Sequence, residues 1–248
     1  MKISIITVSF NSASTIEDTL KSVISQDYKN IEYIIIDGGS TDGTLDIIDQ
    51  YKNNIKTIVS EPDKGIYDAM NKGIELSSGD VVGILNSDDI YENNKVLSLV
   101  NDAFTINVDA VYGDIEYVDR LNLKKRLRLW KAGEFKSNSF KWGWMPPHPG
   151  FFIKKSKYNE FGTYQLDLGS SADYELMLRM IAKRKIKLKY IPEIITKMRM
   201  GGVSNKSVKN RVQANKNDRL AWKVNDLKPF WFTIWLKPIR KIGQFIRT

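Results

Sequence analysis

Apolar, β-branched runs alternate with helical patterns along the first third of the chain. The runs predict strands at residues 3–10, 31–37, 55–60 and 79–85. Between them, apolar residues recur every three or four positions, as in the stripe formed by Ile16, Leu20, Val23 and Ile24. Near-continuous apolar strands joined by crossover helices are typical of a parallel sheet that helices cover on both faces. The pattern therefore predicts an α/β fold with a mainly parallel, twisted sheet.

After residue 90 the pattern is less regular. It predicts strands at residues 109–118, 122–130, 150–153 and 186–191, and helices at 170–182 and 204–224. The segment 122–130 alternates leucine with basic residues, which favours a strand at the edge of the sheet. We therefore divide the chain into a main domain at 1–204, with halves at 1–90 and 91–204, and a basic helical extension at 205–248.

Two adjacent carboxylates, Asp88 and Asp89, follow the strand predicted at 79–85. In open α/β sheets, ligands bind at the carboxyl ends of the strands. Carboxylate oxygens there bind Mg²⁺ or Mn²⁺ and leave coordination positions free for substrate phosphates. The alternative is that both acids cap the helix that we expect to begin near Glu92, which is a common use of aspartate.

Polar or acidic groups also follow the other predicted strands of the first half. Ser9 and Asn11 stand at the end of the first strand, Asp37 ends the second, and Asp63 follows the third. The chain has neither the Gly-x-Gly-x-x-Gly turn of dinucleotide-binding folds nor a Gly-Lys-Ser/Thr phosphate loop. Because acidic groups repel a nucleoside diphosphate unless a divalent cation intervenes, this crevice favours a metal-assisted nucleotide site.

Composition and charge narrow the function further. The chain has no cysteine, which excludes disulfides, thiolate metal sites and thiol nucleophiles. The net charge of +9 is unevenly distributed, because residues 183–248 hold 18 Lys and Arg against 3 acids, whereas the preceding 182 residues hold 20 against 26. A basic tail of this kind binds either nucleic acid or an anionic membrane surface.

The aromatic content of the tail favours the membrane over nucleic acid. The segment Pro229-Phe230-Trp231-Phe232-Thr233-Ile234-Trp235-Leu236 is followed by basic residues, as in interfacial segments. No apolar stretch approaches the roughly 20 residues of a spanning helix. We therefore expect a cytoplasmic protein, peripheral at the inner face of the cell membrane. The alternative is a C-terminal helix that packs its aromatic residues on the main domain.

Four ordered blocks carry a family resemblance. They read Ile-Ile-Thr-Val-Ser-Phe-Asn, Ile-Ile-Asp-Gly-Gly-Ser-Thr-Asp-Gly-Thr, Asp-Lys-Gly-Ile-Tyr-Asp-Ala-Met-Asn-Lys-Gly and Leu-Asn-Ser-Asp-Asp. They resemble the signature blocks of the family-2 glycosyltransferases of bacterial surface-polysaccharide synthesis. Further blocks at His148–Phe152, Ala172–Leu176 and Gly201–Ser204 extend the resemblance to about residue 204 and leave the tail uncovered.

The resemblance implies a Rossmann-like, nucleotide-sugar-binding glycosyltransferase A-type fold. It also implies an inverting, Mg²⁺- or Mn²⁺-dependent transfer of a sugar from a nucleotide-diphosphate donor, a UDP-sugar first among them, to a saccharide or lipid-linked saccharide. Residues 1–90 would then form the nucleotide-sugar-binding half of the catalytic domain, and residues 91–204 the acceptor-side half.

The resemblance further implies roles for individual residues. Asp173 matches the catalytic carboxylate. The donor-binding set comprises Thr7, Ser9, Asn11, Asp37, Asp68, Asn71, Asn86 and Asp88, and the metal falls to Asp88 or Asp89. Local structural roles are the alternatives: Asp173 as an acid at a helix N-terminus, Asp37 as the cap of the following turn, and Asp68 and Asn71 as stabilisers of their own helix.

The chain departs from the family pattern at two positions. Asn86 stands where many members have Asp, so an amide would contact the ribose. Met70 stands where many relatives have Arg, which removes one diphosphate-neutralising group, and Lys64 or Lys72 are candidates to compensate.

A second group of residues belongs to the Trp/Pro/Gly loop. His148 and Trp144 are candidates for contact with the diphosphate or the acceptor. The alternatives are a loop histidine without a role and a tryptophan that serves packing.

Two other function classes use the same residues. A metal-dependent nucleotidyltransferase or phosphohydrolase would need the acidic strand end, and a non-catalytic nucleotide-sugar-binding module would need only the donor contacts. The presence of both Asp173 and Asp88 argues against the module, because binding alone has no need of both.

Overall fold

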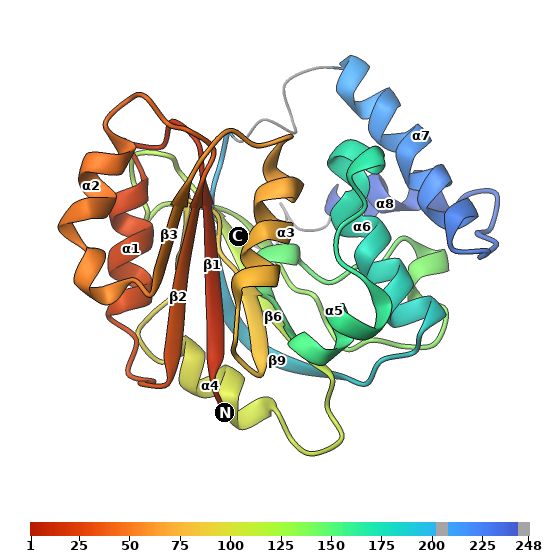
Figure 1. Ribbon diagram of the computed structural model, residues 1–248. Helices are drawn as coiled ribbons and strands as arrows, with labels where there is room; N and C mark the ends of the chain where they lie inside the picture. Colours follow the sequence, from red (N-terminus) through yellow and green to blue (C-terminus); the bar gives the residue numbers. More distant parts are fainter. Residues whose placement is uncertain (202–207, 243–248) are drawn as a thin grey trace.

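The structure is a computed structural model that describes residues 1–201 and 208–242 (Figure 1). The strands are β1 (Ile3–Ser9), β2 (Ile31–Asp37), β3 (Thr57–Ser60), β4 (Val81–Ile84), β5 (Asp89–Tyr91), β6 (Ala110–Val118), β7 (Arg126–Trp130), β8 (Phe151–Lys154) and β9 (Leu188–Arg199). The α-helices are α1 (Ile16–Ile24), α2 (Thr44–Gln50), α3 (Ile66–Leu76), α4 (Val96–Ala103), α5 (Lys155–Phe161), α6 (Ala172–Met177), α7 (Val208–Val224) and α8 (Thr233–Ile242). Shorter helical turns are η1 (Lys52–Asn54), η2 (Ser139–Trp142), η3 (His148–Gly150), η4 (Leu166–Ser171) and the π-helical η5 (Leu178–Lys183).

One sheet joins all the described strands. Its order is β3-β2-β1-β4-β8-β6-β9-β5, and β7 pairs with β6 off this path. The strands β3, β2, β1 and β4 are parallel, whereas β8 pairs antiparallel with both β4 and β6. The α/β prediction is confirmed, and the sheet is parallel over its first four strands and mixed beyond them.

Helices cover both faces of this sheet (Figure 1). Ile3 and Ile5 of β1 lie in the core with α1, α2 and α4, whereas Ile6 and Val8 lie in the core with α3 and α6. All four are at most 4% exposed. Because the central strands are buried on both faces, the sequence shows continuous apolar runs there instead of alternation.

The two halves predicted for the main domain share this sheet. β8, from the second half, lies between β4 and β6, and β5 pairs with β9. Gly83 is needed where β4 passes β8, because a Cβ there would lie 2.4 Å from the Phe152 ring. The helix predicted at 170–182 continues from α6 into the π-helical turn η5, and the strand predicted at 186–191 extends to Arg199 as β9.

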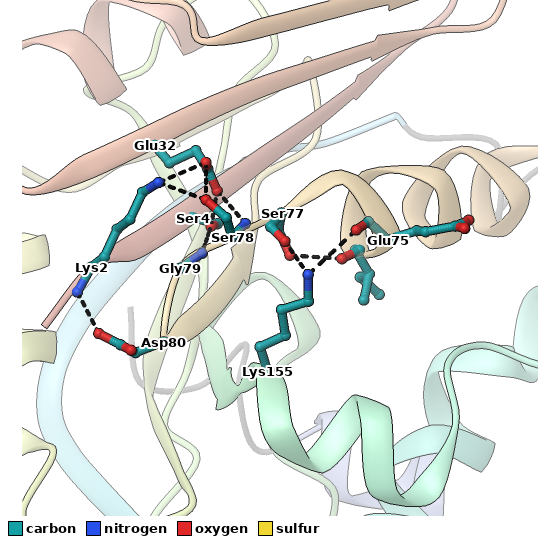
Figure 2. A network of polar contacts seen from close by, with 10 residues as sticks. Lys2, Ser4, Glu32, Glu75, Ser77, Ser78, Gly79, Asp80 and Lys155 are labelled. Atoms are coloured by element: carbon teal, nitrogen blue, oxygen red, sulfur yellow. Dashed lines mark hydrogen bonds and ion pairs between the residues drawn. The ribbon is translucent and has the colours of Figure 1, made fainter.

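A buried carboxylate holds the amino-terminal ends of the first strands (Figure 2). Glu32 of β2 is 5% exposed and accepts hydrogen bonds from Lys2 Nζ (2.8 Å), Ser4 Oγ (2.5 Å), and the N–H and Oγ of Ser78 (both 2.6 Å). Burial acts to raise the pKa of Glu32, but these donors outweigh it and lower the pKa to about 2. The network lies at the end of β2 opposite to Asp37.

The predicted C-terminal extension packs on the main domain. Trp222 of α7 is 2% exposed, and its Nε1 donates a 2.9 Å hydrogen bond to the Tyr174 hydroxyl of α6. Asn225 Nδ2 donates to Glu175 Oε1 at 3.0 Å. Residues 205–248 are therefore not a separate appendage where they are described. Residues 202–207, which include most of the Gly201–Ser204 block, lie outside the described residues, as do 243–248.

Candidate active site

The carboxylate of Asp37 ties together the ends of three strands. Five donors bind its oxygens: Ser9 Oγ of β1 (2.9 Å), Ser60 Oγ of β3 (2.8 Å), the N–H groups of Gly39 (3.0 Å) and Ser40 (2.8 Å), and Ser40 Oγ (2.6 Å). Asp37 is fully buried; burial acts to raise its pKa, but the donors outweigh burial and lower it. Asp37 therefore fixes the glycine-rich turn, as the capping alternative expects, and Ser9 is one of its anchors.

Thr7 and Asn11 lie near the same end of β1 but differ in exposure. Thr7 is fully buried, and its Oγ1 shares a 3.1 Å hydrogen bond with the Tyr33 hydroxyl. This placement argues against the donor contact predicted for Thr7. Asn11 is exposed, and its Oδ1 accepts a 3.0 Å hydrogen bond from the Thr41 N–H. Asn11 therefore stays accessible and also braces the glycine-rich turn.

Asp68 and Asn71, the two residues of α3 predicted to contact the donor, both make hydrogen bonds within the protein. Asp68 Oδ2 accepts a 3.0 Å hydrogen bond from the Lys64 N–H, at the start of the helix. Asn71 Nδ2 donates to the Tyr164 carbonyl and Asn71 Oδ1 accepts from the Tyr164 N–H, each at 2.9 Å. Asn71 therefore clamps the chain at Tyr164, and Asp68 matches the alternative of a helix-stabilising residue.

The two lysines predicted to compensate for Met70 differ. Met70 itself is 2% exposed and lies in the core. Lys72 Nζ lies 2.8 Å from the carboxylates of both Asp63 and Glu61, and its hydrogen bonds to them raise its pKa. The positive charge of Lys72 is thus already balanced by these two carboxylates. The exposed Lys64 remains a candidate for contact with the diphosphate.

Asp88 and Asp89 are adjacent but occupy different environments. Asp88 is half-buried and precedes β5, whereas Asp89 is 1% exposed and pairs with Met198 of β9. Within the described residues, neither carboxylate oxygen of Asp89 has a hydrogen-bond partner, and neither does the buried Oδ1 of Asn86. Burial raises the pKa of both aspartates, and the charge of Asp88 raises that of Asp89 further. Asp88 is therefore the more accessible of the two carboxylates to a cation.

Two arginines that the sequence did not reveal flank this block. Arg199, at the end of β9 and 5% exposed, donates to the Asp88 carbonyl at 3.0 Å and to the Asp18 carboxylate. Arg120, in the turn between β6 and β7, is exposed. The charges of Arg120 and Arg199 both oppose the rise in the pKa of Asp88. Arg120 is therefore a candidate for the positive charge that is absent at Met70.

Asp173, near the N-terminus of α6, lies among tyrosines and the single histidine of the chain. His148 Nε2 and the Tyr164 hydroxyl share a 2.6 Å hydrogen bond. Burial lowers the pKa of His148, and the charge of Asp173 opposes this. Burial also raises the pKa of Tyr67 and of Tyr164, and the charge of Asp173 adds to the rise. The charge of Asp173 therefore acts on His148 and on both tyrosines.

Tyrosine 117, on β6, links this group to the Asp88–Asp89 block. Burial is the main cause that raises the pKa of Tyr117, and the charges of Asp89 and Asp173 both contribute. The Arg128 guanidinium lies 4.2 Å from the centroid of the Tyr117 ring and opposes the rise. The charges of Asp89 and Asp173 therefore both act on the Tyr117 hydroxyl. No motif singles out Tyr67, Tyr117 or Tyr164, although Tyr67 stands within the third family block.

Trp144 is mainly a packing residue. It is 5% exposed, and its Nε1 donates a 2.8 Å hydrogen bond to the Ala132 carbonyl. Trp142 is 52% exposed instead. A cavity of about 570 Å³ is lined by Ala132, Gly133, Glu134, Lys136, Ser137, Ser139, Trp142, Trp144 and Arg240. An acceptor that contacts Trp144 would therefore have to occupy this cavity.

The residues present fit a divalent cation that the donor helps to bind. Within residues 1–201 and 208–242, no cluster of three or more His, Cys, Asp or Glu side chains forms a ready-made metal cage. Mg²⁺ in nucleotide sites is often held by one or two carboxylates together with substrate phosphates. Asp88 is half-buried, and the carboxylate of the adjacent Asp89 has no hydrogen-bond partner among the described residues. This arrangement suits a mode in which the donor supplies the remaining ligands.

Sequence comparison identifies the family. Residues 4–165 match the profile of glycosyl transferase family 2. The chain belongs to this family. A relative from Mycobacterium tuberculosis strain H37Rv, named an uncharacterized glycosyltransferase, is 32% identical over 194 residues, which cover 71% of this chain and 68% of that protein. The putative teichuronic acid biosynthesis glycosyltransferase TuaG of Bacillus subtilis is 40% identical over 97 residues, 38% of each chain.

Solved structures show the same fold. The crystal structure of Staphylococcus aureus TarS 1–349 with UDP-GlcNAc matches 99% of this chain and 72% of that chain, with a TM-score of 0.67 and 17% identity. The mannosyltransferase PcManGT of Pyrobaculum calidifontis, with GDP-Man and Mn²⁺, matches 96% of this chain and 72% of that chain, with a TM-score of 0.66. The family-2 glycosyltransferase has the predicted glycosyltransferase A-type fold.

Proposed function

We propose that this glycosyltransferase transfers a sugar, with inversion, from a UDP-sugar or related nucleotide-diphosphate donor to a saccharide acceptor carried on a lipid. The product would enter a surface polysaccharide. Relatives support this direction, because TuaG is named for teichuronic acid biosynthesis and TarS was crystallised with UDP-GlcNAc. The observation that carries the proposal is the family match, which covers residues 4–165 and includes the acidic pair Asp88 and Asp89.

The proposed reaction is a single displacement. Asp173 accepts the proton of the acceptor hydroxyl while its oxygen attacks the anomeric carbon. The bond from that carbon to the diphosphate oxygen breaks, the nucleoside diphosphate leaves with the electron pair, and the configuration inverts. The charge of Asp173 acts on the hydrogen-bonded pair of His148 and Tyr164, which would orient the acceptor.

The leaving diphosphate needs positive charge. Asp88 would hold Mg²⁺ or Mn²⁺ together with the donor phosphates, and the ion would neutralise the charge that develops on the leaving group. Arg120, beside Asp88, adds a positive side chain of the protein itself. The glycine-rich turn that Asp37 fixes lies at the ends of β1 and β2, and it would form one side of the donor site.

The products distinguish this proposal from its rivals. Membrane extracts that contain the acceptor should stimulate release of nucleoside diphosphate from the donor. Supplied with a nucleoside triphosphate instead, a nucleotidyltransferase would release pyrophosphate and a phosphohydrolase would release orthophosphate, and a binding module would release nothing from either substrate.

Two variants separate binding from chemistry. Asp173→Asn should bind UDP as the native protein does while transfer falls by about 10² to 10⁴, the usual loss for a general base. Asp88→Asn should weaken both UDP binding in Mn²⁺ and transfer. Transfer by Asp173→Asn at the native rate would assign the base to another residue.

A further inference from the structure

One side of α8 and of the turn before it carries exposed apolar residues. Trp231 is 87% exposed, Trp235 58% and Ile239 55%. The three are spaced by four residues, so those on the helix lie on one face of it. Large apolar groups exposed in a row are typical of an interaction surface.

This surface continues onto the main domain. Trp142 of η2 is 52% exposed and Phe230 39%, and their ring centroids lie 5.7 Å apart. We call Trp142, Phe230, Trp231, Trp235 and Ile239 the aromatic face. It joins two segments that are far apart in the sequence, so it is a property of the fold.

The opposite side of α8 is packed on the protein. Thr233 is 1% exposed, and its Oγ1 donates a 2.7 Å hydrogen bond to the Lys141 carbonyl. A Cβ at Gly143 would lie 2.7 Å from the backbone nitrogen of Lys237, so α8 packs directly against the end of η2. Lys237 Nζ lies 2.8 Å from Asp218 Oδ2 and 3.7 Å from the Tyr174 ring centroid. Lys237, one of the basic residues that follow the aromatic segment, therefore binds to the protein itself.

Basic side chains border the aromatic face. Lys228 and Arg240 are exposed, and Lys141 Nζ lies 5.3 Å from the centroid of the Phe230 ring. The cavity beside Trp142 is lined by the basic residues Lys136 and Arg240. Among its described lining residues, Glu134 is the one acid. Exposed indole rings with a basic border are the features of segments that lie in the interface of an anionic bilayer.

We propose that the aromatic face docks on the surface of an anionic phospholipid bilayer. The rings of Trp231 and Trp235 enter the headgroup region, while Lys228 and Arg240 meet lipid phosphates. None of the helices in the described part of the chain has both the length and the apolar character of a membrane-spanning segment. A symmetric pair of two copies through this face would bring their basic borders together, which disfavours a second copy as the occupant.

Docking would also place the active site relative to the lipid. Lys237 of α8 contacts Tyr174, the neighbour of Asp173 on α6, so the docked helix is packed against the helix that carries the proposed base. This consequence rests on the proposed function, because it matters only for a lipid-linked acceptor. The docking itself does not depend on the reaction.

Vesicle binding of the full chain tests the docking without donor or acceptor. The native protein should sediment with vesicles of phosphatidylcholine containing phosphatidylglycerol, and much less with phosphatidylcholine alone or at high salt. Trp231→Ala with Trp235→Ala should weaken the binding about tenfold or more, because two exposed rings are lost. Lys228→Gln and Arg240→Gln should each weaken it about fivefold.

A matched control uses exposed apolar residues elsewhere. Ile106 and Leu121 are 93% and 95% exposed, and Ile106→Ala with Leu121→Ala should bind vesicles as the native protein does. Circular dichroism checks that each variant is folded. Quenching of tryptophan fluorescence by brominated lipid, strong in the native protein and much reduced in the double tryptophan variant, supports insertion of these rings.

Equal sedimentation of the native protein and the double tryptophan variant would overturn the proposal. A dimer in analytical ultracentrifugation that the same variant abolishes, without vesicle binding, would also overturn it and assign the face to a second copy. Vesicle binding without any sugar transfer would uphold the docking and contradict only the proposed function.

Discussion

Replacement of Glu32 by glutamine is expected to lower the free energy of unfolding at neutral pH by about 3 kcal/mol. On folding, the pKa of Glu32 falls from 4.5 to about 2, because hydrogen bonds from Lys2, Ser4 and Ser78 outweigh the effect of burial. Each pKa unit corresponds to about 1.4 kcal/mol. The ionised carboxylate therefore stabilises the folded state by about 3 kcal/mol at pH 7, and a neutral amide loses this contribution.

The pH dependence of the difference tests its electrostatic origin. Because the pKa is lower in the folded state, the contribution of Glu32 is complete above its unfolded pKa of 4.5 and is lost as the pH falls towards about 2. The gap between native and Glu32→Gln protein should therefore shrink to about half at pH 3. Urea unfolding followed by circular dichroism measures both values.

Glu75 provides the control, because its side chain is exposed and points away from the network in Figure 2. Glu75→Gln should change stability by less than about 0.5 kcal/mol. UDP binding by folded Glu32→Gln should be normal, because Glu32 lies at the end of β2 opposite to Asp37. A gap that is equal at pH 7 and pH 3 would refute the electrostatic reasoning and leave a packing effect instead.

Two predictions concern the donor site. Calorimetry should show that EDTA severely weakens UDP binding, because Asp88 and Asp89 repel a bare diphosphate; undiminished binding in EDTA would remove the role of the metal. Arg120→Gln should weaken UDP binding about tenfold, as expected for the loss of a charge-assisted hydrogen bond. Lys124→Gln, at an exposed position in the same turn, should have no effect; equal losses in both variants would instead indicate a diffuse effect of net charge.

Local patterns were sufficient for the first half of the fold. The apolar runs predicted β1, β2 and β4 within a few residues, because each of these strands is buried on both faces. They also located the acidic block at the end of β4. The sheet order beyond β4 was not predictable, since nothing in residues 151–154 indicates that β8 inserts between β4 and β6.

The different environments of Asp88 and Asp89 illustrate the same limit at the site. Asp89 is buried because it pairs with Met198, more than a hundred residues later in the chain. The sequence around the two acids contains no trace of that pairing. His148 and Tyr164 likewise meet through tertiary structure alone, and Asn71, predicted as a donor contact, was found to clamp Tyr164.

The position of β8 and β9 in the sheet has a consequence for biosynthesis. When residues 1–90 have left the ribosome, β4 has β1 on one side and an open edge on the other, and β5 has no strand to pair with. An apolar strand with an open edge recruits other chains. The nascent protein would need protection by chaperones until β8 and β9 emerge, and a chain that ends near residue 90 should aggregate instead of forming a small nucleotide-binding domain.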